Sequence, residues 1–252
     1  MVPLLRRILS GSRPKLEEAT VNKPGTDQAD GLRRLMAGSL GRLVAVVGSG
    51  PRVGTTSVTR NLAAALVQQG QDVLLLDERS GARSTPAQRQ GRVVLIDAVL
   101  DRDGALSALA TQADHVLVVL QPNAASITAS YACIKRLYYA HALKRLRVLV
   151  NCATEVTEAQ RILANLADTG SRYLALALDP AGCVRDDPRL AQAQRLNLTV
   201  VDAFRTSPAA IDFRQIASDL LQWPCCSQDA RSPALPAFQA SSRNTRPVPA
   251  ML

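Results

Sequence analysis

Apolar residues in the middle of the chain gather in short runs that alternate with helical patterns. Five of these runs are nearly continuous and rich in Val, Leu and Ile: Leu43–Val47, Asp72–Asp77, Arg92–Asp97, His115–Leu120 and Leu146–Asn151. A weaker sixth run covers Tyr173–Leu178. Unbroken apolar runs of this length are typical of parallel strands that are covered on both faces. We therefore predict that residues 41–223 form an α/β domain around a doubly wound, mostly parallel sheet.

The segments between the runs have apolar residues at helical spacing. After the first run, one stripe of a predicted helix carries four of them: Val58, Leu62, Ala65 and Leu66. Gly70 is placed to end that helix. A second amphipathic helix is predicted over 208–223, and its few charges do not form the lysine-rich face that anionic lipids attract. We expect this helix to pack on the sheet rather than on a membrane surface.

The two ends of the chain differ from the middle in composition. Residues 1–40 are polar and basic and contain one short helical pattern over 27–36, so we predict a flexible N-terminal region with a single helix. Residues 224–252 contain five prolines among Ser, Arg and Ala and show no periodicity. That composition predicts a disordered tail.

Charge is concentrated toward the ends. The 252-residue chain has 30 Lys plus Arg and 21 Asp plus Glu, for a formal net charge of +9. Residues 1–36 contribute +3 and residues 223–252 contribute +2, which leaves +4 for the middle. A basic face for nucleic acid is therefore not required, and eight aromatic residues are few for a protein that stacks bases. Nucleic-acid binding is not expected.

The sequence also predicts a cytoplasmic protein. No apolar run reaches the ~18 residues of a membrane span, and arginines interrupt the short apolar stretch at the N-terminus. The five cysteines are odd in number and include no C-x-x-C pair, which is typical of free thiols in a reducing compartment.

The turn after the first apolar run has the composition of a phosphate-binding loop. It reads VGSGPRVGTTS over 47–57, between a predicted strand and a predicted helix. Such turns bind phosphates because backbone N–H groups and the helix N-terminus attract anions. The candidate nucleotide-binding residues are Gly48, Ser49, Gly50, Arg52, Val53, Gly54, Thr55, Thr56 and Ser57. Gly54 and Thr56 fit the pattern G-x-x-x-x-G-K-[ST], but Thr55 stands in the lysine position.

Several motifs occur in one order along the chain: DQADGLR at 27–33, the loop at 47–57 with NLAAAL after it at 61–66, VLLLD at 73–77, VVLID at 93–97, ADHVLVVLQPNAASITASYACIKRL at 113–137, VLVN at 148–151 and TVVDAFRTSPAA at 199–210. Together they resemble the MinD/ParA family of deviant Walker ATPases and, within it, the flagellar number regulators FlhG and FleN. The resemblance spans 27–222. It implies a P-loop NTPase architecture that binds ATP or ADP with Mg²⁺.

The resemblance also implies roles for individual residues. Thr56 and Asp97 correspond to the family's Mg²⁺ ligands, Asn151 to its adenine contact, and Asp77 to a catalytic acid. The residues taken alone leave other roles open: Thr56 is equally suited to be a helix N-cap, and Asn151 to be a turn residue.

Three charged positions of the family are absent from this chain. The two lysines of the family loop G-K-G-G-V-G-K-T fall on Gly50 and Thr55, and a second acidic residue after Asp77 falls on Arg79. Phosphoryl transfer depends mostly on positioning and electrostatic stabilisation, so we predict that ATP hydrolysis, and ATP/ADP binding with Mg²⁺, are weak or lost. Arg52 is the candidate substitute for a lysine. The short polar connection over 78–91 predicts that the nucleotide-sensing switch elements are missing as well.

The segment 27–33 resembles the activator helix with which FlhG docks on the SRP-type GTPase FlhF. The predicted partner-binding residues are Asp27, Gln28, Leu32 and Arg33, and Gln28 corresponds to the residue that stimulates GTP hydrolysis. The alternative is an ordinary helix start with Asp27 as its N-cap.

The leading hypothesis is a cytoplasmic FlhG-like regulator of flagellar placement or number that acts on an FlhF-type GTPase and on flagellar assembly proteins. Association with the inner face of the plasma membrane or with the cell pole is left open. One alternative is an active MinD/ParA-type ATPase of cell division, partition or polar positioning, and another is a nucleoid- or DNA-binding partition-type protein. A homodimer is left open, but the lysine missing at Gly50 argues against nucleotide-driven dimerisation.

Overall fold

Seven strands form one sheet in the part of the chain that the computed structural model describes, residues 41–79, 83–84 and 92–224. The strands are β1 Arg42–Gly48, β2 Asp72–Asp77, β3 Arg83–Ser84, β4 Arg92–Ala98, β5 His115–Leu120, β6 Arg145–Ala153 and β7 Ala177–Arg185. Their order across the sheet is β3-β2-β4-β1-β5-β6-β7. All neighbours are parallel except the short edge strand β3, which is antiparallel to β2. The predicted doubly wound, mostly parallel α/β sheet is confirmed.

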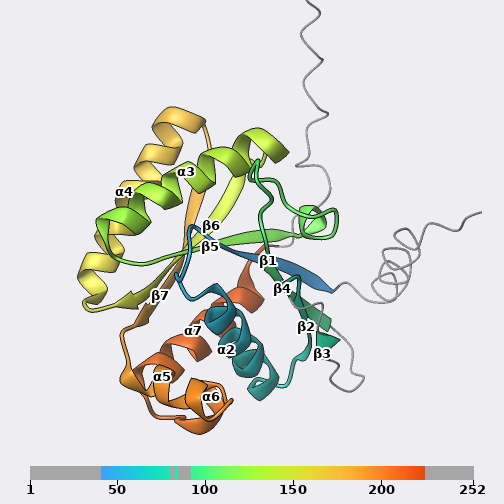
Figure 1. Ribbon diagram of the computed structural model, residues 1–252, viewed down its shortest axis with the longest axis vertical. Coiled ribbons are helices and arrows are strands. Elements are labelled where there is room, and N and C mark those ends of the chain that lie inside the picture. The colour runs from blue at the N-terminus through green and yellow to red at the C-terminus, as the bar shows by residue number, and fades with distance from the viewer. Residues whose placement is uncertain (1–40, 80–82, 85–91, 225–252) are drawn as a thin grey trace, which may run out of the picture. The chain divides into compact units, whose positions relative to one another are not determined.

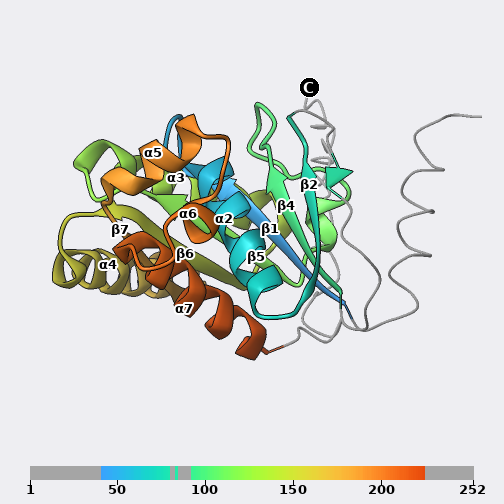
Figure 2. The same ribbon diagram turned by 90° about the horizontal axis from the view of Figure 1, so that it is seen from below.

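Two layers of helices cover the sheet (Figure 1). One face carries α2 Thr55–Gln68, α5 Pro188–Arg195, α6 Val200–Ala203 and α7 Pro208–Gln222. The other face carries α3 Ala124–His141 and α4 Val156–Leu174, and a short 3₁₀ helix, η1 Ala110–Gln112, precedes β5. In the view turned by 90°, α2 and α7 lie in front of the strands (Figure 2). Because parallel strands need crossover connections, this arrangement buries the sheet on both sides.

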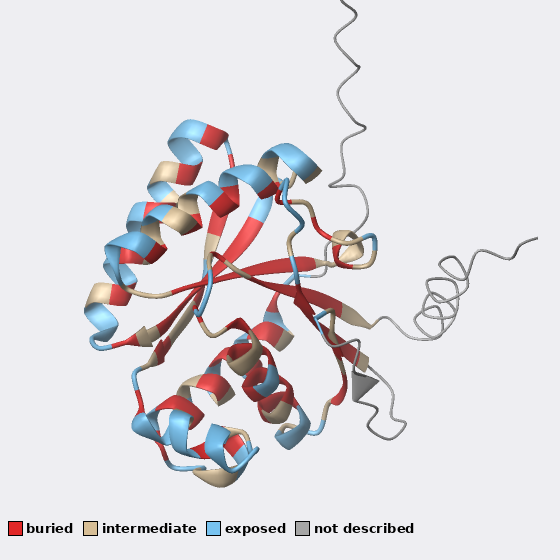
Figure 3. Cartoon of the chain, viewed as in Figure 1, coloured by how far each residue is buried: buried red, intermediate tan, exposed pale blue. Residues whose placement is uncertain are grey.

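The core follows the apolar runs of the sequence (Figure 3). All six residues of β5 are buried, as are the five central residues of β1. The predicted stripe of α2 is fully buried, and Gly70 follows the helix with φ 82°, a conformation that glycine adopts without strain. The predicted helix over 208–223 is α7, whose Phe213, Ile216 and Leu220 are buried in the core. The expectation that it packs on the sheet is confirmed.

One strand begins later than the pattern indicates. Tyr173 and Leu174 belong to the last turn of α4, and the strand β7 runs from Ala177 to Arg185. The turn between α4 and β7 passes through Ala175, whose φ is 48°. The continuous apolar run gives no indication of this turn. The rest of β7 contains Pro180 and Gly182, which an edge strand tolerates because one side of it has no neighbouring strand.

Several sequence predictions fall outside the described residues. These are the helix over 27–36, with Asp27, Gln28, Leu32 and Arg33, and positions 225–252 of the predicted tail. The proposed boundaries of the N-terminal region and the tail therefore stay predictions.

The chain's one tryptophan, Trp223, anchors the end of α7 near the amino ends of the strands. The Arg147 guanidinium lies 4.1 Å from the centre of the Trp223 ring, and the ring of His115 meets Trp223 edge-on at 5.2 Å. Arg42 donates a hydrogen bond to the carbonyl of Leu220 at the end of the helix. Residues from β1, β5 and β6 thus hold the last turn of α7.

The anchor places a neutral histidine in a positively charged setting. Burial, followed by the nearby charges of Arg147 and Arg42, lowers the pKa of His115 to about 4. Protonating His115 would add a charge to a buried ring next to two arginines, so the folded state resists it.

We expect the free energy of unfolding to fall as the pH drops from about 6.5 to about 4, by at most about 3 kcal/mol from this residue. The unfolded chain binds a proton to His115 near pH 6.5, whereas the folded chain binds it only near pH 4. Urea unfolding followed by Trp223 fluorescence, for the wild type and for His115→Gln, measures this contribution. The free energy of unfolding should depend more steeply on pH in the wild type than in His115→Gln, and only between pH 4 and pH 6.5. Equal pH dependence in the two proteins would contradict the lowered pKa of His115.

Candidate functional site

The glycine-rich loop joins the carboxyl end of β1 to the start of α2. β1 lies between β4 and β5, so the loop stands where the sheet connections change direction. In open α/β sheets this is where phosphate-containing ligands bind. Gly48 ends β1, Gly54 precedes α2, and Thr55, Thr56 and Ser57 form the first turn of the helix.

Close packing requires glycine at two positions of the loop. A Cβ on Gly48 would lie 2.4 Å from the hydroxyl oxygen of Thr55. A Cβ on Gly54, whose φ is 87°, would lie 2.4 Å from Nδ2 of Asn151. Both separations are too short for a real carbon atom, so these positions accept only glycine without a shift of the neighbouring side chain.

Hydrogen bonds with residues outside the loop also hold it in place. Arg52 adopts φ 60°, and its carbonyl accepts a hydrogen bond from the Gln121 amide at 3.3 Å. Ser49 donates its backbone N–H to the Val119 carbonyl at 2.9 Å, and its hydroxyl lies 3.5 Å from that of Ser126. The segment that leads from β5 into α3 thus supports one side of the loop. Sequence reasoning missed Gln121, which directly follows a predicted strand, and Ser126, which lies in the first turn of α3.

The two lysine positions carry no positive charge. Thr55 is buried, and its hydroxyl lies over Gly48 inside the loop. Gly50 has open surroundings, because a Cβ there would meet only the Ala129 side chain of α3 at 3.8 Å. The loop therefore keeps the backbone shape of a phosphate cradle without the cations that usually accompany it.

The structure brings Thr56 and Asp97 together. The Thr56 hydroxyl donates to Oδ2 of Asp97 at 2.5 Å, so Thr56 does not cap the helix, whose N-cap residue is Gly54. Asp97 is 1% exposed, and among the described residues its Oδ1 has no hydrogen-bond partner. Burial raises the pKa of Asp97, while the Thr56 hydrogen bond and the charge of Arg79 oppose that rise.

These two residues fit a magnesium ion. Mg²⁺ in nucleotide sites is commonly held by one or two carboxylates or hydroxyls together with phosphate oxygens and water. A buried carboxylate oxygen without a partner, next to a threonine hydroxyl, is a suitable donor pair. No group of three His, Cys, Asp or Glu within 41–79, 83–84 and 92–224 could hold a metal by itself. A metal here would therefore also need oxygens from a bound phosphate.

Asp77 and Asn151 also lie at this edge of the sheet. Asp77 is opposite Asp97 in the register of β2 and β4, and its Oδ1 accepts the backbone N–H of Arg79 at 2.9 Å. Asn151 is buried, and its side-chain amide donates to the Val53 carbonyl at 2.9 Å. The structure thus gives Asn151 a bracing role in the loop, and its contact with adenine stays a prediction.

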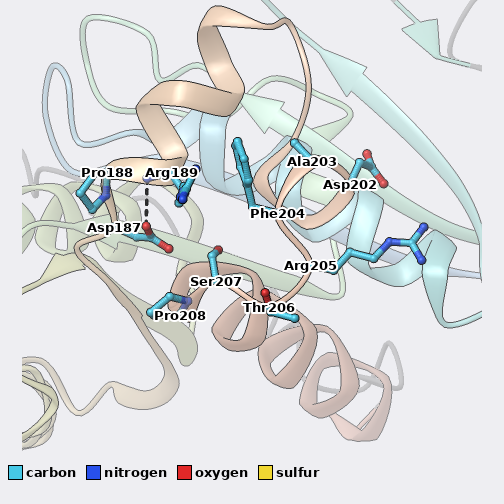
Figure 4. A pocket seen from close by; sticks show the side chains of 10 residues that line it. All are labelled: Asp187, Pro188, Arg189, Asp202, Ala203, Phe204, Arg205, Thr206, Ser207 and Pro208. Atoms are coloured by element: carbon cyan, nitrogen blue, oxygen red, sulfur yellow. Dashed lines mark hydrogen bonds between the residues drawn. The ribbon is translucent and has the colours of Figure 1, made fainter.

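A separate hollow of about 620 Å³ lies between the starts of α5 and α7 and the segment after α6 (Figure 4). None of the predicted loop residues lines it. Its buried carboxylate, Asp187, accepts the backbone N–H groups of Arg189 and Ala209, and the Arg189 guanidinium lies 4.8 Å from the centre of the Phe204 ring. These polar groups are occupied in joining α5 to α7, so the glycine-rich loop remains the candidate site.

We expect Gly54→Ala to destabilise the fold by about 2–3 kcal/mol, because it combines a left-handed backbone with a clash against Asn151. Gly70→Ala is the matched control, since Gly70 has φ 82° and no atom within 4 Å of its Cβ position, and it should cost about 1 kcal/mol. Urea unfolding measures both. In a double-mutant cycle, Asn151→Ala should recover part of the Gly54→Ala loss, and full additivity would show that the two residues do not meet.

No family model matches the sequence. The antiactivator FleN of Pseudomonas aeruginosa is 28% identical in an alignment that covers 73% of this chain and 87% of FleN.

Solved structures with a similar fold include MinD proteins. MinD of Aquifex aeolicus has a TM-score of 0.57 at 16% identity and covers 73% of this chain and 98% of its own. MinD of Pyrococcus horikoshii, solved with Mg-ADP, has a TM-score of 0.53 at 14% identity and covers 71% of this chain and 95% of its own. At these identities the likeness concerns the fold. The chain thus has the fold of the MinD/ParA family of P-loop ATPases and is related in sequence to FleN.

Proposed function

We propose that this protein is a FleN-like regulator of flagellar number or placement that works by binding other proteins rather than by turning over ATP. One observation carries the proposal: the glycine-rich loop keeps its shape while both lysine positions, Gly50 and Thr55, are uncharged. The sequence similarity to FleN supports the flagellar role.

The energetics favour a loss of turnover. Removing one electrostatic contact to a transition state commonly costs about 3–4 kcal/mol, or 10²–10³ in rate. Two such contacts are absent here, because neither Gly50 nor Thr55 can reach a phosphate with a positive charge. ATP or ADP would rest on the backbone of the loop, and Thr56 and Asp97 would hold the Mg²⁺ that neutralises its phosphates.

We further propose that the protein acts on an FlhF-type GTPase through the segment 27–33, with Gln28 as the residue that stimulates GTP hydrolysis. The apolar stripe of α7 is buried in the core and is therefore occupied, which favours proteins over lipid as binding partners. The part of the chain that the structure describes contains no helix long and apolar enough to cross a membrane. We place the protein in the cytoplasm, with recruitment to the cell pole through its partners.

The first test uses the full chain and a purified FlhF-type GTPase. We expect the chain to accelerate GTP hydrolysis at least tenfold and Gln28→Ala to return the rate to the basal value. Gln160→Ala is the matched control, because Gln160 is exposed on α4 and distant in sequence from the proposed segment. Equal stimulation by Gln28→Ala and the wild type would overturn the proposed partner role.

The second test concerns ATP. We expect the wild type to hydrolyse ATP no faster than Asp97→Ala, and the double variant Gly50→Lys/Thr55→Lys to bind MgATP at least tenfold more tightly than the wild type. Gly50 has room for the side chain, since its Cβ position meets only Ala129 at 3.8 Å. Calorimetric titration and phosphate release measure the two quantities. Turnover by the wild type that Asp97→Ala abolishes would instead identify an active ATPase.

A further inference from the structure

The outward side of α3 differs in charge from that of its neighbour α4, although much of each helix is exposed (Figure 3). α4 exposes charges of both signs, such as Arg161 and Asp168. α3 contains no aspartate or glutamate, and residues 115–154 as a whole contain none. The cations that α3 exposes are Lys135 and Arg136. This helix therefore lacks the mixture of charges that is typical of a helix face that meets only water.

Exposed tyrosines lie close to these cations. The four tyrosines of the chain all belong to α3 and α4: Tyr131, Tyr138, Tyr139 and Tyr173. Tyr139 is 68% exposed and Tyr173 is 73% exposed, the two largest values for a large apolar side chain among the described residues. α3 and α4 contact each other and run in the same direction, because each follows one strand of the parallel pair β5 and β6. Both exposed tyrosines therefore lie near the same end of the sheet.

Tyr139 is held in place by its neighbours on α3. Lys135, one turn earlier, has its ammonium 5.9 Å from the centre of the Tyr139 ring, and the Tyr138 ring meets that ring edge-on at 5.3 Å. A tyrosine that is ordered before binding loses little side-chain entropy when a partner arrives. Exposed and ordered tyrosines beside cations are typical of the residues that contribute most to protein interfaces.

Lys135 and Arg136 also have charges to offer. Among the described residues, no carboxylate forms an ion pair with either of them. Other cations at the ends of α3 and α4 do have carboxylate partners, in the pairs Arg145–Asp179 and Arg172–Asp168. The charges of Lys135 and Arg136 are therefore available to carboxylates of another molecule.

The segment 99–109 brings two aspartates to one flank of α3. A Cβ on Gly104 would lie 2.8 Å from the Cβ of Arg136, so this segment packs on the Arg136 side of the helix. The carboxylate of Asp101 accepts the backbone N–H of Asp103 at 2.9 Å and is thus engaged within its own turn. Lys135 lies about 100° around the helix from Arg136, away from this flank.

Three kinds of occupant fit this side of α3 poorly. In a symmetric contact with a second copy of the chain, Lys135 and Arg136 would oppose the same cations. A membrane surface would require exposed Leu, Phe or Trp on the helix, but the large apolar side chain that α3 exposes is Tyr139. A nucleic acid would find two cations here, whereas binding to its backbone commonly uses about six to ten phosphate contacts.

We propose that the side of α3 formed by Lys135, Arg136 and Tyr139 binds an acidic segment of another protein. Carboxylates of that segment pair with the two cations, and an apolar side chain of the segment packs on the ring of Tyr139. The charge complementarity rests on the absence of aspartate and glutamate from residues 115–154. The proposal goes beyond the proposed function, because it involves neither the glycine-rich loop nor the segment 27–33.

The test is fluorescence anisotropy of the full chain with two labelled peptides. One peptide contains four repeats of Glu-Glu-Leu-Asp, and the other contains four repeats of Gln-Gln-Leu-Asn. We expect the acidic peptide to bind at least tenfold more tightly than the amide peptide. Raising the NaCl concentration from 50 to 300 mM should weaken binding of the acidic peptide at least threefold, because salt screens exposed charges.

Variants of α3 locate the binding surface. Lys135→Glu/Arg136→Glu should weaken binding of the acidic peptide at least tenfold, and Tyr139→Ala at least fivefold, whereas Tyr139→Phe keeps the ring and should stay within twofold of the wild type. Arg161→Glu/Arg195→Glu is the matched control, because it changes the net charge equally at two exposed residues on α4 and α5. This control should bind within about threefold of the wild type. Urea unfolding confirms that each variant is folded.

Three results would overturn the proposal. The first is no binding of the acidic peptide at 1 mM, and the second is equal binding by Lys135→Glu/Arg136→Glu and the matched control. The third is tighter binding of 20-base-pair duplex DNA, or of vesicles that contain phosphatidylglycerol, than of the acidic peptide, if the α3 variants remove it. That result would assign this side of α3 to nucleic acid or to lipid. None of the three bears on the stimulation of GTP hydrolysis or on ATP.

Discussion

Burial of parallel strands on both faces is the constraint from which the rest of this structure follows. Neighbouring parallel strands can be joined only by crossovers, so their carboxyl ends meet at one edge of the sheet. That edge gathers Gly48, Asp77, Asp97 and Asn151 from four different strands. The topology of the sheet therefore sets the position of the candidate site, whatever the chemistry of its residues.

The shape of the loop and its charge prove to be independent. The shape rests on steric contacts, in which Gly48 lies under Thr55 and Gly54 lies against Asn151, and on hydrogen bonds from Gln121 and Asn151. None of these contacts needs a cation. A P-loop can therefore lose its lysines and still fold, because the groups that stabilise a transferring phosphate are not the groups that hold the backbone in place.

The two ends of the strands in the sheet carry different groups of interacting residues. The carboxyl edge carries the loop and the charged residues around Asp97, while the amino edge holds the end of α7 through Trp223, Arg147 and His115. Arginine serves both edges in different ways. At the amino ends of the strands the Arg147 guanidinium packs on the Trp223 ring, and at the carboxyl ends the charge of Arg79 opposes the rise that burial causes in the pKa of Asp97.

The sequence by itself determined the α/β class, the five main strands, the helix after the loop and the absence of lysine from the loop, because these depend on local periodicity and on residue identity. It misjudged the start of β7, since the apolar run through Tyr173 and Leu174 continues from a helix into a strand without a change of composition. Only the tertiary structure decided that Asn151 braces the loop, that Gln121 supports Arg52 and that Thr56 bonds to Asp97. Each of these is a contact between segments far apart in the chain, and no local pattern encodes which distant residues a folded sheet brings together.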